Sequence, residues 1–127
     1  MPTKLITDLI EEGQTFPRHI RLLGSRDYQL VFRDNSVRVS DNMWSLLARH
    51  NELGHARLGM AISKRVVKNA VQRNRLKRIV RESFRHHQHQ LPGLDIVVMC
   101  RDGVNQANNR ELFSSLDRHW KRVKERA

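Results

Sequence analysis

One strongly basic stretch constrains this chain more than any other feature. From residue 63 to residue 85 the sequence reads SKRVVKNAVQRNRLKRIVRESFR, and its single acidic residue is Glu82. Asn69 is a suitable N-cap and neither Pro nor Gly follows it in the stretch, so we predict a helix that begins there. The stretch contains nine cationic residues, which are Lys64, Arg65, Lys68, Arg73, Arg75, Lys77, Arg78, Arg81 and Arg85.

The second half of this helix divides into an apolar face and a basic face. The apolar side carries Leu76, Ile79, Val80, Ser83 and Phe84, and the basic side carries Asn74, Arg75, Lys77, Arg78, Arg81 and Arg85. Cations also recur at four-residue steps from Arg73 to Arg85, a spacing at which like charges repel by a few tenths of a kcal/mol per pair. Since solvated helix faces normally mix both signs, the pattern indicates a polyanionic partner, and nucleic acid is the main candidate.

The charge of the whole chain supports the same partner. Its 127 residues include 24 Lys and Arg against 13 Asp and Glu, a formal net charge of +11. This excess favours nucleic acid or an anionic membrane surface. No apolar run approaches the roughly 18 residues of a membrane span and no leader pattern is present, so we expect neither membrane insertion nor secretion. A single cysteine excludes an internal disulfide and fits a cytoplasmic protein.

The hydrophobic pattern around the basic helix predicts one mixed domain. Residues 1–15 form an N-terminal extension, in which Leu5, Ile6, Leu9 and Ile10 have helical spacing and indicate either a short docked helix or a frayed end. Further helices are expected at 25–32 and from Asn108 or Asn109 onward, and strands at 37–39, 43–48, 57–63 and 94–100. The order α-β-β-β-α-β-α predicts an α+β sandwich with helices packed on a central four-stranded sheet. The domain should span residues 16–122, with a C-terminal tail at 123–127.

Two segments outside the basic stretch have features that favour either packing or RNA binding. Tyr28 and Phe32 are four residues apart and share one helix face. Such aromatic pairs are more often core, but in a basic chain with few aromatics they also suit base stacking. In the strand at 57–63, Gly59, Ala61 and Ser63 form a small-residue face, which leaves room for either a packed helix or an RNA strand.

The other reactive residue types favour structural roles. His86, His87 and His89 have no Cys or carboxylate at ligand spacing, so we do not expect a metal site. Glu82 is expected to pair with Arg78 or His86, and Cys100, in an apolar strand, to be a buried thiol. Asp95 and Asp102 lie at opposite ends of that strand. Without an acidic cluster that could hold two Mg²⁺ ions, we expect no nuclease chemistry from the protein itself.

Three segments resemble the protein subunit of bacterial ribonuclease P, in that family's order. They are FPRHIRLLGSRDYQLVF (16–32), RLGMAISKRVVKNAVQRNRLKRIVRESFR (57–85) and LPGLDIVVMCRDG (91–103). The middle segment contains the Arg-Asn-Arg core at 73–75. That tripeptide alone would be a weak signal, but the full segment is long and unusual, and the resemblance covers about residues 16–122.

The resemblance implies that the catalyst is a large partner RNA, whose Mg²⁺ ions promote removal of the 5′ leader from precursor tRNA. The protein would bind no cofactor itself and would be a monomer in a one-to-one ribonucleoprotein, away from any membrane. The residues at family positions that contact the catalytic RNA are Lys64, Arg65, Lys68, Asn69, Arg73, Asn74, Arg75, Lys77, Arg78 and Arg81. Tyr28 and Phe32 match aromatic positions of a cleft for the single-stranded leader, between the first helix and the sheet.

The resemblance also implies a left-handed strand–helix–strand unit around the basic helix. This sequence differs from the family at two positions: it has Tyr28 where Phe is common, and Lys68 where some relatives carry Gly. The alternative function is a structural RNA-binding protein of the ribosomal kind, in which both aromatics would be buried. A third possibility, a nuclease that acts without RNA, would require cleavage by the protein alone.

Overall fold

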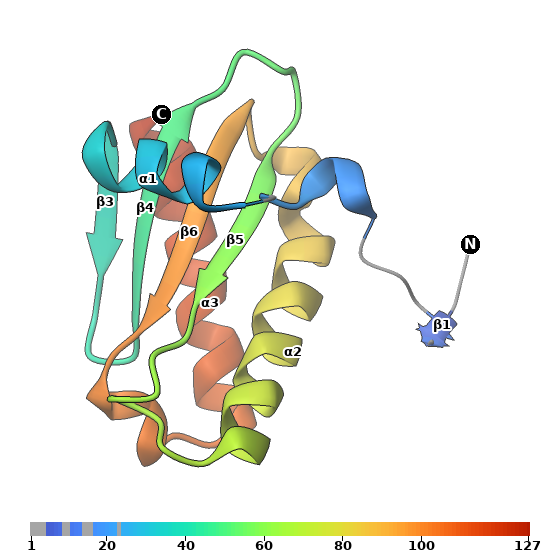
Figure 1. The fold of residues 1–127 in the computed structure, drawn as a ribbon, viewed down its shortest axis with the longest axis vertical. Coiled ribbons are helices and arrows are strands. Elements are labelled where there is room, and N and C mark those ends of the chain that lie inside the picture. The colour runs from blue at the N-terminus through green and yellow to red at the C-terminus, as the bar shows by residue number, and fades with distance from the viewer. Residues whose placement is uncertain (1–4, 9–10, 14–16, 23) are drawn as a thin grey trace.

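The chain is built around one mixed four-stranded sheet (Figure 1). The computed structural model describes residues 5–8, 11–13, 17–22 and 24–127. Its elements are β1 (Leu5–Asp8), β2 (Glu11–Gly13), the 3-10 helix η1 (Arg18–Ile20), α1 (Ser25–Arg33), β3 (Val37–Ser40), β4 (Trp44–His50), β5 (Arg57–Ala61), α2 (Ala70–His87), η2 (Gln88–Gln90), β6 (Leu94–Cys100), η3 (Asp102–Asn105) and α3 (Asn109–Arg126). From α1 onward this order confirms the predicted α+β fold.

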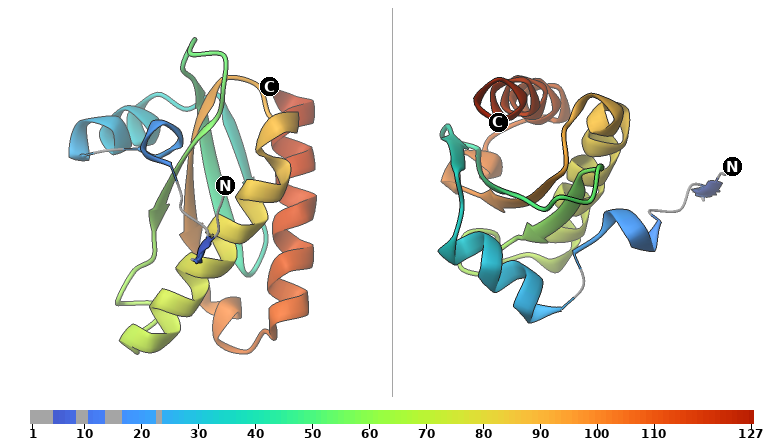
Figure 2. Two further views of the ribbon diagram at one scale, coloured as in Figure 1. Left: turned by 90° about the vertical axis from the view of Figure 1, so that its right-hand side faces the viewer. Right: turned by 90° about the horizontal axis from the view of Figure 1, so that it is seen from above.

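The strand order of the sheet is β3-β4-β6-β5. β4 is antiparallel to both β3 and β6, whereas β5 and β6 are parallel. Figure 2 shows α1 on one face of the sheet and both α2 and α3 on the other. Viewed from the α2 side with the parallel strands pointing up, β6 lies to the left of β5 (Figures 1 and 2). The β5–α2–β6 crossover is therefore left-handed, against the usual preference and as the resemblance implied.

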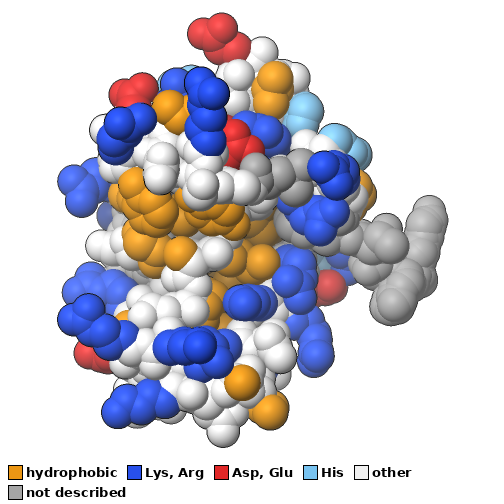
Figure 3. All heavy atoms as spheres, viewed as in Figure 1, with side chains coloured by type: hydrophobic (Ala, Val, Ile, Leu, Met, Phe, Trp, Pro, Cys, Tyr) orange, Lys and Arg blue, Asp and Glu red, His pale blue; other side chains and the backbone are white. Residues whose placement is uncertain are grey.

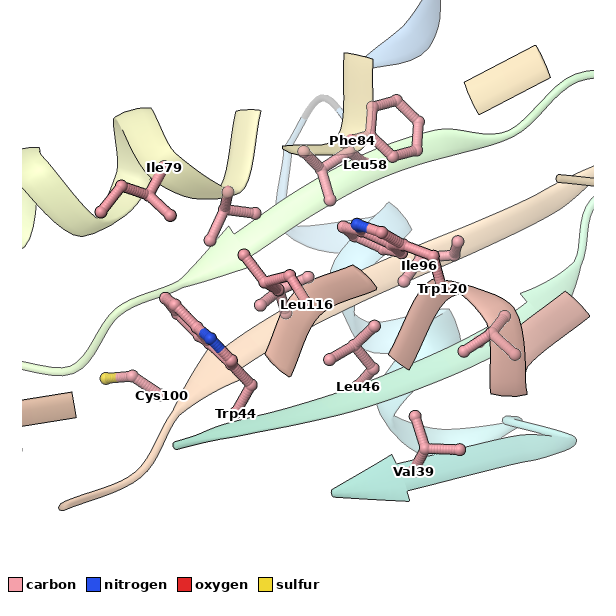
Figure 4. Close-up of a cluster of buried hydrophobic side chains, with 14 of the residues drawn as sticks. Val39, Trp44, Leu46, Leu58, Ile79, Phe84, Ile96, Cys100, Leu116 and Trp120 are labelled. Atoms are coloured by element: carbon pink, nitrogen blue, oxygen red, sulfur yellow. The ribbon is translucent and has the colours of Figure 1, made fainter. Parts of the chain in front are cut away.

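The main core fills the space between the sheet and the helices α2 and α3 (Figure 4). The rings of Phe84 and Trp120 meet edge to face, with centroids 5.7 Å apart. The indole N–H of Trp120 donates to Ser83 Oγ at 2.8 Å, which joins α3 to α2. The indole N–H of Trp44 donates to the carbonyl oxygen of Leu112 at 3.3 Å. These contacts confirm the apolar face predicted for the basic helix and show that α3 buries one as well.

The opposite face of the sheet carries a smaller cluster under α1. Its buried members are Leu22, Val31, Leu47 and Val97. A Cβ atom at Gly59 would lie 2.7 Å from Tyr28 Cε1, so only glycine lets the Tyr28 ring pack on β5 at this point. The small face of this strand is thus occupied by a helix, the first of the two predicted alternatives.

The structure differs from the sequence-based predictions at both ends of the chain. The helical spacing in residues 1–15 is misleading, because Leu5–Asp8 and Glu11–Gly13 pair as an antiparallel ribbon and the remainder lies outside the described residues. A pattern of one or two turns falls well short of the roughly 12 residues at which an isolated helix becomes marginally stable. At the other end, α3 continues to Arg126. Residues 123–127 are not a tail, because Val123 is fully buried and extends the apolar stripe by one turn.

Within the described residues, no helix is both long enough and apolar enough to span a membrane.

Candidate nucleic-acid interface

Hydrogen bonds give the loop before α2 a defined backbone. The N–H of Arg65 donates to Ser63 Oγ, and the N–H of Val67 donates to the carbonyl oxygen of Ser63, both at 3.0 Å. From the other side, Asn105 Nδ2 donates to the carbonyl oxygen of Val66 at 3.0 Å. This backbone presents three exposed cationic side chains, which are Lys64, Arg65 and Lys68.

The start of α2 uses two of the predicted RNA-binding residues for its own structure. Asn69 is the N-cap, as predicted, and its side chain accepts the N–H of Gln72 at 3.1 Å. Arg73 Nη1 donates to the carbonyl oxygens of Val67 and Lys68, both at 2.9 Å. Arg73 therefore holds the loop against the helix, a role that the sequence-based interpretation missed.

Farther along α2, Arg75 joins the basic helix to the start of α3. Its Nε atom donates to Asn109 Oδ1 at 3.0 Å, and Nη2 bonds to the same oxygen. This contact orients the guanidinium group at the surface. The remaining predicted contacts on the helix are the exposed Asn74 and Arg78 and the half-buried Lys77 and Arg81.

The one acidic residue of the stretch neutralises little of its charge. Glu82 Oε2 lies 2.7 Å from Arg85 Nη2 and 3.9 Å from His86 Nδ1. The predicted contact between Glu82 and His86 is confirmed. The cationic partner of Glu82 is Arg85, however, and not Arg78. Of the nine cations in the stretch, only Arg85 lies within 4.0 Å of a carboxylate in the described part of the chain. The surface is left with a strong excess of positive charge.

A cleft of about 600 Å³ opens between η1, α1, β5 and α2. Its floor is apolar and its rim is basic, and its lining residues are Pro17, Arg18, Arg21, Leu22, Tyr28, Leu58, Met60 and Arg81. Figure 3 shows the surface character of this side of the molecule, where hydrophobic side chains cross the middle and Lys and Arg side chains surround them. An apolar floor with cations around it suits a single strand of nucleic acid, because bases stack on the floor while phosphates meet the rim.

Arg81 connects this cleft to the basic face of α2. Burial, together with the nearby charges of Arg78 and Arg21, lowers the pKa of Arg81. The pKa falls because Arg81 is a partly desolvated cation that lies beside two like charges. A phosphate group in the cleft would supply the missing negative charge.

The two predicted leader-binding aromatics occupy different environments. Tyr28 lines the cleft, and its hydroxyl oxygen accepts the N–H of Met60 at 3.1 Å. Phe32 lies one turn farther along α1 and is 43% exposed, but it does not line this cleft. The structure thus brings Tyr28, but not Phe32, to the floor of the cleft, inside the basic rim. Neither residue is fully buried, which disagrees with the burial expected of a purely structural RNA binder.

Comparison with known proteins identifies the family. The sequence model of the family described as Ribonuclease P matches residues 16–124. This chain belongs to the ribonuclease P protein family. It is 47% identical over 112 residues to the ribonuclease P protein component of Marinomonas sp. (strain MWYL1), which covers 88% of this chain and 85% of that protein. For the Pseudomonas aeruginosa component the identity is 49% over 111 residues, with 87% and 82% covered.

Solved structures of ribonuclease P proteins have the same fold. The protein from Staphylococcus aureus superposes with a TM-score of 0.74 at 28% identity, covering 82% of this chain and 94% of that chain. The protein from Thermotoga maritima gives a TM-score of 0.72 at 30% identity, covering 81% and 96%. The range matched by the family model, residues 16–124, contains both the basic helix and the residues that line the cleft.

In this ribonuclease P protein, a buried ion pair anchors the strands behind the cleft. Arg57 Nε and Nη2 donate to the two carboxylate oxygens of Asp95 at 2.8 and 2.7 Å. Asn51 Nδ2 also donates to Asp95, at 2.9 Å, and Asp27 on α1 lies 3.9 Å from Arg57. The hydrogen bond to Asp95 raises the pKa of Arg57. The sequence placed Asp95 at the start of a strand but did not indicate its partner.

The remaining candidates for chemistry have local contacts. Nδ1 of His86 and Nδ1 of His87 lie 2.9 Å from the carbonyl oxygens of Glu82 and Ser83, one turn back. No group of three or more His, Cys, Asp or Glu side chains is arranged to hold a metal ion within the described residues. Cys100 is buried, as predicted, and its burial raises the pKa of the thiol.

Proposed function

We propose that this chain contributes RNA binding rather than chemistry to ribonuclease P. As a member of the family it is a protein subunit of that endoribonuclease, which removes the 5′ leader of precursor tRNA. The observation that carries the proposal is that α2 serves two surfaces at once. Its exposed side and the loop before it form a basic face, while Arg81 on the same helix lines the cleft. The catalytic RNA and the leader would therefore bind side by side.

The cleft suits a leader of variable sequence. Such a strand must be held without reading its bases, and stacking on aromatic or apolar groups contributes about 1–3 kcal/mol per base. Tyr28 provides a ring at the floor of the cleft, and Arg18, Arg21 and Arg81 lie around it. Each guanidinium group can donate two hydrogen bonds to one phosphate.

The basic face suits docking on a structured RNA. Its exposed cations project from a loop and a helix that are already ordered, so the backbone that carries them does not have to fold on binding. Arg and Lys would contact phosphates and 2′-hydroxyl groups. On a single strand, about six phosphate contacts would give a slope of log affinity against log salt near −4, at roughly 0.7 per contact.

The division of labour extends to the metal and to the partners. We infer that the Mg²⁺ ions of the reaction are bound by the partner RNA, which the family resemblance implies is the catalyst. One copy of this chain would bind one catalytic RNA, in the cytoplasm, where precursor tRNA is made. These assignments rest on membership of the family alone.

Precursor-tRNA cleavage at low Mg²⁺ concentration tests the proposal. The reaction is run with catalytic RNA alone, with protein alone and with both. We expect efficient cleavage only in the mixture, because protein cations replace the charge neutralisation that Mg²⁺ otherwise provides. Cleavage by the protein in a verified RNA-free preparation would show that it has its own active site. Binding to RNA without any stimulation would show a purely structural binder.

A further inference from the structure

A second pocket adjoins the leader cleft. It has a volume of about 360 Å³ and lies between η1, the loop that follows β4 and the end of α2. Pro17 lines both the cleft and this pocket. Two consecutive residues of η1 line different sites: Arg18 lines the cleft and His19 lines the pocket. A strand that leaves the cleft past Pro17 therefore meets the pocket directly.

The lining of this pocket combines an apolar floor with a polar, aromatic rim. Ile20, Ala56 and Leu91 form the floor, with 2 to 7% of their surface exposed. The rim carries the accessible imidazole rings of His19, His55 and His89 and the amide of Gln88. Imidazole rings stack on bases, and imidazole and amide groups hydrogen-bond to base edges. This is the chemistry of a nucleobase site.

The rim is organised before any ligand binds. His55 Nε2 lies 3.0 Å from the carbonyl oxygen of His19, and because a carbonyl only accepts, this nitrogen carries the proton. The two imidazole rings meet edge to face, with centroids 5.6 Å apart. Asn51 Nδ2 donates to the carbonyl oxygen of His55 at 3.1 Å, and the same amide bonds to Asp95. The pocket is thus fixed by the network that anchors Arg57 behind the cleft.

We propose that this histidine pocket, formed by His19, His55 and His89, binds one base of the single-stranded RNA that continues beyond the leader cleft. The proposal rests on the proposed function, because it extends the path of the leader by one subsite. The volume lies within the lower part of the range for small-molecule sites, about 300 to 1,000 Å³, and suits a single nucleotide. The three histidines are not arranged as metal ligands among the described residues, which leaves their rings available for stacking.

A leader-length series tests the pocket. Holoenzyme is reconstituted from catalytic RNA and full-length protein, and its affinity is measured for precursor tRNAs whose leaders lengthen by one nucleotide at a time. The variant is the double substitution His55→Ala and His89→Ala. The matched control is His50→Ala, an exposed histidine at the end of β4 that does not line the pocket. We expect the variant to lose about 5- to 150-fold in affinity once the leader reaches the pocket, the loss expected for one stacked base. Shorter leaders, mature tRNA and the control variant should bind like the wild type.

The outcomes separate the pocket from the cleft. If wild-type affinity rises with leader length and the variant follows the same curve, the pocket is wrong and the cleft stands. If wild-type affinity does not depend on the leader at all, the cleft is wrong, and the pocket has no strand to extend. An equal loss of affinity for every substrate, mature tRNA included, would show that the histidines stabilise the fold and do not contact the leader. His55→Phe, which keeps a stacking ring, should retain most of the affinity, and thermal unfolding of each variant checks the fold.

Discussion

The two faces of the central sheet are packed very differently. The face toward α2 and α3 is sealed, and the side chains of Trp44, Leu116 and Trp120 on this side are at most 1% exposed. Among the described residues, the face toward α1 buries four apolar side chains, and Tyr28 and Met99 beside them stay partly exposed. One sheet thus stabilises the protein with one face and offers the other to a ligand.

The difference follows from what each face has to do. Apolar surface removed from water contributes roughly 25 cal/mol per Å², so a face filled by two long helices supplies most of the stability. A cleft that binds a strand cannot also be filled by the protein. α1 therefore covers only part of its face, and the edge strand β5 is held by Leu22, whose N–H donates to the carbonyl oxygen of Leu58 at 3.0 Å. The open part keeps its cations and its floor for RNA.

The largest effect should come from truncating matched leucines on the two faces. Leu116→Ala empties part of the sealed core and should cost about 2–5 kcal/mol of unfolding free energy, toward the upper end. Leu22→Ala, in the small cluster beside the cleft, should fall at or below the lower end, because the neighbouring surface can relax. Urea unfolding followed by circular dichroism measures both. A larger loss of unfolding free energy for Leu22→Ala than for Leu116→Ala would contradict the conclusion that the face toward α2 and α3 supplies most of the stability.

The next effect concerns charge and separates position from total charge. Replacing Lys64, Arg65 and Lys68 with Ala should weaken binding to the catalytic RNA and reduce the magnitude of the salt slope by about 2, at roughly 0.7 per lost contact. The control removes the same charge from α3, through exposed residues Lys121, Arg122 and Lys124. Equal changes in slope for both triple variants would mean that net charge, and not the loop, determines docking.

A smaller effect should distinguish the two aromatics. Tyr28→Leu removes the ring from the cleft. It should weaken the binding of precursor tRNA by about 1–3 kcal/mol relative to the binding of mature tRNA. Phe32→Leu should have less effect, because Phe32 does not line the cleft. Tyr28→Phe is the matched control that removes only the hydroxyl bonded to Met60. If Tyr28→Leu weakens both RNAs equally, Tyr28 is a packing residue and not a leader contact.

Whether a feature of the fold or the site could be predicted from the sequence depended on how far apart in the chain its contacting residues are. The basic helix, its Asn69 cap and its apolar face follow from local periodicity, and all three are confirmed. The bond from Arg75 to Asn109 joins residues 34 positions apart, and no local pattern indicates such a partner. Arg18 and Arg21 carry no sequence signal beyond their charge, because the fold alone brings them to Arg81.

The failures also have a physical cause. At the N-terminus, an apolar spacing over two turns is too short to decide between helix and strand, and Ile6 and Thr7 are β-branched residues that favour strands. Phe32 shares a helix face with Tyr28 by spacing, but the cleft ends before it, since α1 crosses the sheet and only part of its length faces η1. Periodicity gives the face of a helix, not the extent of the surface opposite.

The smallest effect is the pH dependence of the sealed face. The carboxylate of Asp41 bonds to the hydroxyl of Ser115 and lies 3.2 Å from His119 Nε2. Burial alone would raise the pKa of Asp41, but the bonds from Ser115 and from two backbone N–H groups lower it from 3.8 to about 2. Burial lowers the pKa of His119, and this effect outweighs the attraction of Asp41. Both groups therefore hold fewer protons in the folded state than in the unfolded state.

A group whose pKa is depressed by folding stabilises the protein above its unfolded pKa and loses that contribution as the pH falls. Stability should therefore decline first below about pH 6.5, through His119, and again between about pH 4 and pH 2, through Asp41. Urea midpoints of the wild type and of Asp41→Asn, measured from pH 8 to pH 2.5, test this. The variant should be less stable at neutral pH but lack the second decline, and parallel curves would exclude Asp41 as its source.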